Sequence, residues 1–540
     1  MTNSHSKRTD SDQGRRRLRM IIPGYPAFNV YSAVANKTTA LGPVCVASAV
    51  NEVPGWDAEV IDENNYRRPG PMEATGNRPD YAALQERRPA DVVGFYGGLT
   101  STIPRLFELA RLCRNQGLTT IAGGQHFAGG NIREALENGV DFVVIGEGED
   151  TIRELLEHLD GRRDKADIRG IAYLDEGSVV KTAERDPITD FDRLPQPDFS
   201  LVRYANIVFY PVGRVRGCAM HCEFCTVNSR PRYASIERFL SQFIELYEKY
   251  NARQFFVVDD LFGQKRSETI ELCRRLEEYQ KWAGTRFRIT VQIRLDRAKD
   301  TELLDAMRGA GVNMLAIGLE SPIREELEAM NKQLDPEEMI RQVRTYRRKG
   351  FRVHGMFIFG YPMPAGVDFR MPADERVRQF RRFMRKSSID TIQVLLPVPL
   401  PGTELNRRLE EQNRIFPRGH VGWEYYDGNF PLFEPDPPMT AEDMQTALRR
   451  IYGRFYQARR MLPLALHTLS MPAVIFHLHN LKKAWRRWDR RWWRSVFRFS
   501  GWRILRRWTA DLKKSDFSTR IAGARRALKQ TSKQRELQSK

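Results

Sequence analysis

The sequence predicts an α/β protein in which two parallel sheets follow one another and a basic, helical extension ends the chain. Short apolar segments alternate with helical patterns in two separate parts of the chain, which is typical of parallel sheets with helical connections. A Pro-rich stretch at 194–198 separates the two parts. Residues 481–540 carry 20 Lys and Arg against 4 Asp and Glu, together with six of the nine tryptophans.

The first part, residues 19–165, is expected to form a doubly wound sheet of the Rossmann or flavodoxin type. Its expected strands are 18–23, 58–62, 91–96, 119–122 and 141–145, and a helix is expected at 103–116. Glycines stand at the ends of three of these strands: Gly97, Gly98, Gly123, Gly124, Gly146 and Gly148. Ligands of such sheets bind at the carboxyl ends of the strands, where glycine lets them approach the backbone. The alternative is that these glycines only serve tight turns.

Residues 206–410 are expected to form a partial (β/α)6 barrel of the TIM type, after a hairpin and linker at 166–205. Its expected strands are 254–258, 289–293, 314–317, 353–359 and 391–395, and its expected helices are 266–282, 301–310, 322–330 and 336–349. Catalytic groups of such barrels lie at the carboxyl ends of the strands. Residues 411–460 are expected to lie on the substrate side, and they match no motif that identifies a substrate.

Three cysteines stand close together in the chain. Cys218, Cys222 and Cys225 have the spacing C-x3-C-x2-C. A [4Fe–4S] cluster has four irons that each take a thiolate, so three ligands leave one iron open to another molecule. A structural zinc site would need a fourth Cys or His, and the other cysteines offer no second pair. His221 is the nearest rival ligand, but one short loop would struggle to direct four groups inward.

The cysteine loop, with Phe224 before its last cysteine, resembles the radical S-adenosylmethionine (SAM) superfamily. The resemblance implies that Cys218, Cys222 and Cys225 ligate a [4Fe–4S] cluster and that Phe224 lies against the adenine of SAM. In that family SAM binds the open iron, and one-electron reduction cleaves it to a 5′-deoxyadenosyl radical. The resemblance also implies an electron donor such as flavodoxin or ferredoxin.

Polar residues at the barrel's strand ends fit the same resemblance. Asp259 or Asp260 would accept a hydrogen bond from the amine of SAM, or cap the helix that follows. Gln292 and Arg294 would hold the ribose and the carboxylate, for which the planar Arg fork is suited. Glu320 lies in the phrase at 316–321 that resembles the segment beside the adenosyl group. Ile358 lies in the phrase at 356–362 that resembles the strand bordering adenine, and 399–403 resembles a late-barrel phrase of the cobalamin-dependent subset.

The first part of the chain resembles the cobalamin-binding class, because an α/β domain directly precedes the barrel. The phrases Gly123-Gly124-Gln125-His126 and Gly146-Glu147-Gly148-Glu149 carry this resemblance, which implies that Glu147 and the glycines lie near cobalamin. The D-x-H-x-x-G motif is missing after the first strand, where 23–26 read Pro-Gly-Tyr-Pro. Cobalt would then have no protein nitrogen below it, or the domain has lost the cofactor. His126 either faces the corrin or caps the following helix.

Composition limits where the protein works. The sequence contains no run of about 20 apolar residues, so no membrane-spanning helix is expected. Residues 1–18 form a basic leader without an apolar core, which is expected to be disordered and is no secretory signal. Six cysteines, three of them in one motif, indicate a reducing cytoplasm rather than a disulfide scaffold. The net charge of +19 belongs mainly to the two ends of the chain, so the catalytic body is near neutral.

The tail at 461–540 is expected to be helical and amphipathic. One face carries large apolar residues at three- and four-residue steps: Leu481, Trp485, Trp488, Trp492, Val496 and Phe499. Arginines and lysines fill the rest, which is typical of a helix in an anionic membrane interface. The alternatives are packing on the protein's own barrel and stacking on single-stranded nucleic acid, which we favour least. Residues 461–478 are expected to form a second interfacial or core helix, and 513–540 a frayed helix or a disordered end.

Together these features predict a cobalamin-dependent radical SAM enzyme that methylates an unactivated carbon of a lipid-like or secondary-metabolite substrate. It would be cytoplasmic, with peripheral contact to the inner face of the membrane through the tail. One alternative is radical cyclisation or rearrangement on the same scaffold. Another is modification of RNA, and a non-enzymatic alternative is an iron–sulfur sensor at the membrane.

Overall fold

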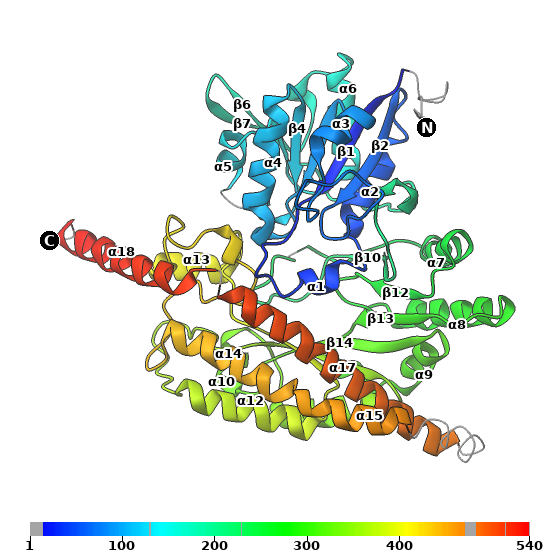
Figure 1. Ribbon diagram of the computed structural model, residues 1–540, viewed down its shortest axis with the longest axis vertical. Coiled ribbons are helices and arrows are strands. Elements are labelled where there is room, and N and C mark those ends of the chain that lie inside the picture. The colour runs from blue at the N-terminus through cyan, green and yellow to red at the C-terminus, as the bar shows by residue number, and fades with distance from the viewer. Residues whose placement is uncertain (1–13, 129–130, 228, 470–481, 514, 539–540) are drawn as a thin grey trace. The chain divides into compact units, whose positions relative to one another are not determined.

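A computed structural model describes residues 14–128, 131–227, 229–469, 482–513 and 515–538 (Figure 1). The chain forms two compact units. The N-terminal unit holds the residues up to Tyr25, Val34–Arg214 and Arg232–Ala252, and the C-terminal unit holds Pro26–Ala33, Val215–Pro231 and the chain from Arg253 onward. Most of the expected leader lies outside the described residues.

The N-terminal unit is built on a mostly parallel sheet. Its strand order is β7-β6-β5-β4-β3-β1-β2-β8, with β6 and β7 antiparallel at one edge. The strands are β1 (Arg16–Ile22), β2 (Trp56–Asp62), β3 (Val92–Tyr96), β4 (Thr119–Gly123), β5 (Phe142–Val144), β6 (Ile171–Asp175), β7 (Ser178–Lys181) and β8 (Val202–Arg203). The five predicted strands and the predicted hairpin are confirmed to within about two residues. Because the order reverses beside β1, the ends of β1 and β3 form the switch point where such sheets bind ligands.

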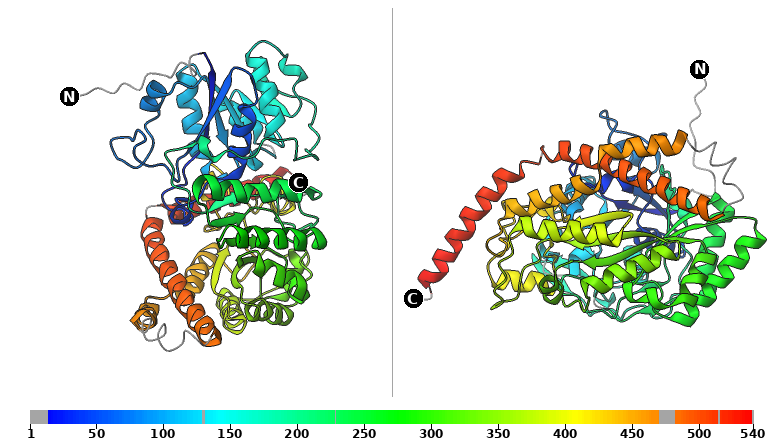
Figure 2. Two further views of the ribbon diagram at one scale, coloured as in Figure 1. Left: turned by 90° about the vertical axis from the view of Figure 1, so that its right-hand side faces the viewer. Right: turned by 90° about the horizontal axis from the view of Figure 1, so that it is seen from below.

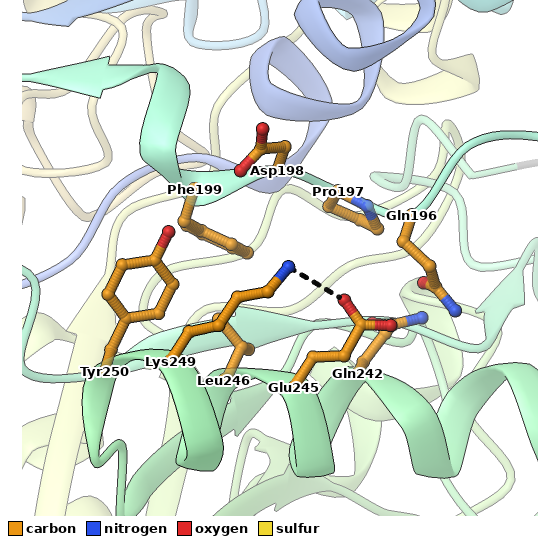
Figure 3. A pocket seen from close by; sticks show the side chains of 9 residues that line it. All are labelled: Gln196, Pro197, Asp198, Phe199, Gln242, Glu245, Leu246, Lys249 and Tyr250. Atoms are coloured by element: carbon orange, nitrogen blue, oxygen red, sulfur yellow. Dashed lines mark ion pairs between the residues drawn. The ribbon is translucent and has the colours of Figure 1, made fainter.

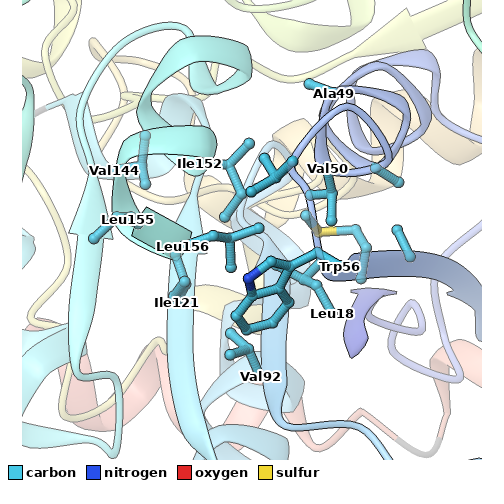
Figure 4. Packing of buried hydrophobic residues seen from close by; sticks show 14 of the residues in the cluster. Leu18, Ala49, Val50, Trp56, Val92, Ile121, Val144, Ile152, Leu155 and Leu156 are labelled. Atoms are coloured by element: carbon cyan, nitrogen blue, oxygen red, sulfur yellow. The ribbon is translucent and has the colours of Figure 1, made fainter. Parts of the chain in front are cut away.

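Helices connect these strands along the chain. They are α1 (Ser32–Ala35), α2 (Leu41–Val50), α3 (Tyr81–Arg87), α4 (Ile103–Asn115), α5 (Ile132–Glu137) and α6 (Gly148–Leu159). A further helix of this unit, α7 (Ile236–Tyr250), comes later in the chain. Figure 4 shows the core between the sheet and the two helices α2 and α6, where Trp56 packs among apolar side chains. The Trp56 indole NH donates to Asp160 Oδ2 at 3.0 Å, so this large side chain is buried with its polar atom satisfied.

The first strand begins at Arg16, inside the segment expected to be a disordered leader. Arg19 is buried, and its Nε lies 2.7 Å from Oε1 of Glu59, which is itself fully buried. Burial alone would raise the pKa of Glu59, but Arg19 and Arg88 together lower it. Arg17 pairs with Asp57 in the same way, at 2.6 Å. The arginines at this end of the basic run are therefore part of the sheet, paired across β1 and β2.

The C-terminal unit contains the parallel strands of the predicted barrel. Neighbouring strands follow chain order: β12 (Gln254–Val257), β13 (Arg288–Gln292), β14 (Val312–Glu320), β15 (Arg352–Ile358) and β16 (Thr391–Leu395). The helices between and after them are α8 (Arg266–Trp282), α9 (Thr301–Gly309), α10 (Arg324–Ala329), α11 (Pro336–Arg348), α12 (Ala373–Ser387), α13 (Glu404–Glu411) and α14 (Ala441–Phe455). The predicted partial barrel is confirmed. Short strands β9 (Tyr210–Val212), β10 (Val215–Arg216) and β11 (Arg232–Tyr233) flank the cysteine segment along the chain.

The tail contains α15 (Met461–Leu469), α17 (Lys482–Leu512) and α18 (Phe517–Gln538). Much of α17 packs on its own unit, as one of the three readings expected. Arg494 Nε lies 3.2 Å from Asp390 Oδ1, the Arg498 guanidinium lies 4.4 Å from the centre of the Phe455 ring, and Trp508 is 3% exposed. Leu481 lies outside the described residues. No helix in the described part of the chain is long and apolar enough to cross a membrane.

The last helix, α18, also packs on the C-terminal unit. Phe517, Ile521 and Ala524 are buried along one side of it. Arg525 pairs with Glu434 at 2.9 Å and with Glu442 at 2.6 Å. The expected frayed or disordered end is therefore a helix as far as Gln538, with a buried face between Phe517 and Ala524.

Candidate active site

The cysteine segment begins at a glycine that no other residue could replace without strain. Gly217 has φ +97°, and a Cβ added there would lie 2.5 Å from the carbonyl oxygen of Arg230. The Cys218 amide donates to the Ser229 carbonyl at 3.0 Å, which closes the loop on itself. Cys218, Cys222 and Cys225 are all half-buried free thiols. The loop thus presents three thiols over eight residues, which fits the donor set of a [4Fe–4S] cluster with one open iron.

Within the described ranges, no three His, Cys, Asp or Glu side chains are arranged to hold a metal ion. Burial raises the pKa of the Cys222 and Cys225 thiols.

Asp259 and Asp260 follow β12 and hold the chain that leads into the cysteine loop. Asp259 is buried and its Oδ1 accepts from the Val215 amide at 2.9 Å. Asp260 Oδ2 accepts from the Gly217 amide at 2.7 Å, and burial raises its pKa. The expected alternative, that they cap the next helix, is wrong because the N-cap of α8 is Lys265. Contact of either carboxylate with SAM stays a prediction.

Glu223 stands between two of the cysteines, and its side chain contacts residues that come much later in the chain. Its Oε1 lies 2.5 Å from Arg408 Nε on α13, and its Oε2 accepts from the Tyr361 hydroxyl at 2.7 Å. The Glu223 carbonyl also accepts from the Leu405 amide at 3.1 Å. We call Glu223, Tyr361 and Arg408 the loop clamp. No local sequence pattern indicates the clamp, because its members stand up to 185 residues apart.

Phe224 lies between two parts of this site. Its ring packs edge-on against Tyr361, with 6.1 Å between the ring centres. The Lys332 ammonium lies 5.8 Å from the centre of the Phe224 ring. The predicted adenine-stacking residue is therefore already placed by the clamp and by a cation.

Glu320 and Lys332 form an ion pair beside the cysteine loop. Glu320 ends β14 in the left-handed region, at φ +55°, where the strand register shifts against β15. Lys332 Nζ lies 3.0 Å from Glu320 Oε1. Burial would lower the pKa of Lys332, but Glu320 and the Cys222 side chain raise it, so the ammonium stays charged. One positive and one negative group next to the thiols fit the carboxylate and amine of SAM. Sequence reasoning found Glu320 and missed Lys332.

The other predicted SAM contacts occupy neighbouring strand ends. Gln292 ends β13, and its carbonyl accepts from the Phe262 amide at 2.8 Å. Arg294 is half exposed, pairs with Asp296 at 2.8 Å, and reaches the Met220 sulfur in the cysteine loop at 3.3 Å. Ile358 ends β15 and is paired in register with Leu395. These residues lie at the strand ends where the barrel predicts them, and their contacts with SAM stay predictions.

The predicted cobalamin edge of the N-terminal unit combines close packing with open backbone. Gly124 has φ +131°, and a Cβ there would lie 2.5 Å from the Gly97 carbonyl carbon and 2.6 Å from the Gly98 nitrogen. The Gly97 amide donates to the Gly123 carbonyl at 2.7 Å. These glycines serve tight packing between the ends of β3 and β4. Gly146, by contrast, has φ +90° with no atom within 4 Å of its missing Cβ. Backbone open at that strand end fits a flat ligand such as a corrin.

His126 and Glu147 have partners within the N-terminal unit. His126 is 1% exposed and its Nδ1 lies 3.3 Å from the Thr100 hydroxyl. That burial favours a structural role over contact with a corrin. Glu147 Oε2 accepts from the Ile188 amide and from Arg232 Nη1, both at 2.7 Å. Gly148 begins α6, so Glu147 ties the start of that helix to the linker.

A small pocket of the N-terminal unit lies between the linker and α7 (Figure 3). Lys249 and Glu245 form an ion pair across its floor, at 3.5 Å. Its cavity volume is about 20 Å³, which is room for about one water molecule. It is too small to hold a cofactor.

Two protein families match the chain in the same order as the two units. The radical SAM superfamily matches residues 213–410, and the B12 binding domain matches residues 30–156. The first range contains the strands of the barrel from β12 to β16, and the second contains strands β2 to β5 of the doubly wound sheet.

Curated relatives share most of the chain. An uncharacterized methyltransferase of Pyrococcus horikoshii is 26% identical over 397 residues, which cover 71% of this chain and 82% of that protein. The hopanoid C-2 methylase of Rhodopseudomonas palustris is 27% identical over 423 residues, covering 76% and 72%. The anaerobic magnesium-protoporphyrin IX monomethyl ester cyclase of Rubrivivax gelatinosus is 24% identical over 388 residues, covering 68% and 66%.

A solved structure shares the fold. It is the cobalamin-dependent S-adenosylmethionine radical enzyme OxsB with aqua-cobalamin bound, at a TM-score of 0.60 and 13% identity, covering 94% of this chain and 81% of that one. With the cysteine loop, the charged pair beside it and the open strand end of the first sheet, the family matches settle the cofactors as a [4Fe–4S] cluster, SAM and cobalamin. By these matches the chain contains a radical SAM domain at residues 213–410 and, before it, a B12-binding domain at residues 30–156.

Proposed function

We propose that this protein transfers a methyl group to an unactivated carbon of a lipid-like small molecule. The observation that carries the proposal is the likeness to a hopanoid C-2 methylase over 76% of the chain. When bound, the cluster and SAM supply a carbon-centred radical, and cobalamin supplies the methyl group. An electron donor such as flavodoxin or ferredoxin would reduce the cluster, and the enzyme would work at the cytoplasmic face of a membrane.

The chain's own residues have distinct tasks in this proposal. Lys332 would bind the carboxylate of SAM through its ammonium, and Glu320 would accept from the amine. The loop clamp would keep the three thiols in one orientation to hold the cluster. Arg294, which already reaches Met220 in the cysteine loop, would lie at the rim beside them.

Replacing Lys332 by Met tests its task. The variant keeps the length of the side chain and removes the charge, so we expect SAM to bind about tenfold to a hundredfold more weakly. The KM for SAM should rise more than kcat falls, and Lys332→Arg should restore part of the binding. Lys299→Met is the matched control, because Lys299 is 74% exposed on the unit's surface. Unchanged SAM affinity in Lys332→Met would remove Lys332 from the site.

Isotope transfer tests the reaction itself. The protein, with its cluster and cobalamin restored under anaerobic conditions, is incubated with reductant, trideuteromethyl SAM and a lipid extract. We expect a lipid that gains a trideuteromethyl group only when reductant is present. The same label found in an RNA fraction, or no label in any product, would contradict the proposal.

The cyclase relative supports a second candidate, radical cyclisation on the same scaffold. It predicts a product that depends on SAM and reductant but carries no label. If the protein is instead an iron–sulfur sensor, the reduced protein will not cleave SAM. The labelled incubation therefore separates all three.

A further inference from the structure

Large apolar side chains are exposed on one short helix. Four of them lie within the nine residues of α15: Met461 is 58% exposed, Leu462 66%, Leu466 58% and Leu469 78%. A stable monomer scatters such residues singly, and a cluster of them marks a contact surface. Elsewhere in the described chain, the exposed large apolar residues stand singly in the sequence, at least 13 positions apart.

These residues share one face of α15. With Ala465 they stand at steps of one, three and four residues, which places them within a single stripe of the helix. Pro463 and Leu464 are half-buried on the other side. Figure 2 shows α15 alongside α17, and the Trp492 indole NH donates to the Thr468 hydroxyl at 3.1 Å. One side of α15 therefore packs on α17, and the apolar stripe is left outward.

The surroundings of the stripe are basic. Arg459 precedes the helix and is exposed, and Arg491, beside Trp492 on α17, is exposed as well. An open groove of about 580 Å³ begins at Gln457 and Ala458, just before α15, and is lined by Trp502 and Leu505 with Arg506. Apolar side chains next to arginines match an anionic amphiphilic surface. The apolar side chains suit its acyl layer, and the arginines suit its anionic head groups.

We propose that α15 docks this protein on an anionic lipid bilayer, with Met461, Leu462, Leu466 and Leu469 inserted at the interface. A second copy of the chain is the poorer occupant, because a symmetric contact would bring two strongly basic tails together. The proposal rests on the proposed function only for the idea that the protein works at a membrane, and it adds that α15 is the helix that contacts it. It also moves the contact away from α17, where Arg494 and Arg498 are used within the protein.

Sedimentation with vesicles tests the proposal on the full chain, without SAM or reductant, so that it can fail independently of methyl transfer. The protein is mixed with vesicles of phosphatidylcholine, or of phosphatidylcholine and phosphatidylglycerol. We expect binding to the anionic vesicles, and a loss of about tenfold or more in the Leu462→Gln/Leu466→Gln variant.

The matched control is Leu112→Gln/Val367→Gln, which removes two exposed apolar residues from α4 and from the loop before α12. It should bind like the native chain, and circular dichroism checks that both variants fold. Equal binding of the α15 variant and the control would overturn the proposal. So would binding that ignores phosphatidylglycerol, or a change in oligomeric state without a change in vesicle binding.

Discussion

Replacing Cys222 by Ala will lower the reductive cleavage of SAM to less than about one thousandth of the native rate. Three thiolates are the fewest that hold a [4Fe–4S] cluster with one iron left open, so two cannot keep both the cluster and the open site. The reconstituted variant should contain little iron and sulfide, and its reduced form should lack the cluster's electron paramagnetic resonance signal. Release of 5′-deoxyadenosine measures the cleavage.

The control for this experiment is Cys45→Ala, which removes a half-buried thiol from α2 in the N-terminal unit. It should load a full cluster and cleave SAM at the native rate. A Cys222→Ala variant that still cleaved SAM would show that another residue ligates the third iron, and His221 would be the first to replace.

Replacing Arg376 by Met will destabilise the C-terminal unit by about 3–5 kcal/mol, because it leaves a buried carboxylate without its cation. Arg376 on α12 and Glu326 on α10 are both fully buried, with 2.5 Å between Arg376 Nη1 and Glu326 Oε1. Burial raises the pKa of Glu326, and Arg376 opposes that shift. Denaturant unfolding of the full chain measures the loss, which should be smaller at pH 5 than at pH 8 because an unpaired Glu326 can take up a proton.

Arg378→Met is the matched control, since Arg378 stands two residues further along α12 and is exposed. Its unfolding should match that of the native chain. Glu326 also accepts from the Ser321 hydroxyl, next to Glu320, so Arg376→Met should weaken SAM binding as well. A loss of less than about 1 kcal/mol would mean that the two charges are not both buried as described.

Local patterns were enough to predict the sheets. Alternating apolar and helical segments placed the five expected strands of each sheet to within about two residues, except β14, which ends three residues later than expected. They could do so because a buried strand must be apolar whatever surrounds it. The short edge strands β8 and β9 were not predicted. These patterns failed where charged residues of a strand are buried because each is paired with an opposite charge. Arg17 and Arg19 belong to a basic run, yet each has a carboxylate on β2 opposite it, and no local pattern records that partner.

The site divides in the same way. The thiols and Glu320 stand in short motifs and are readable from the chain. Lys332 contacts Glu320, which stands 12 residues before it, and Arg408 contacts Glu223, which stands 185 residues before it. Neither pair forms a sequence motif, so only the fold brings these two cations to the site. The tail shows the limit of a helical pattern, which predicts an apolar face but not which surface covers it.

The loop clamp has a consequence for how the protein matures. Glu223 leaves the ribosome 185 residues before Arg408, so the cysteine loop emerges without the side chain that fixes it. A cluster delivered during synthesis would meet a loop free to move, and one delivered afterwards would meet a loop already held in place.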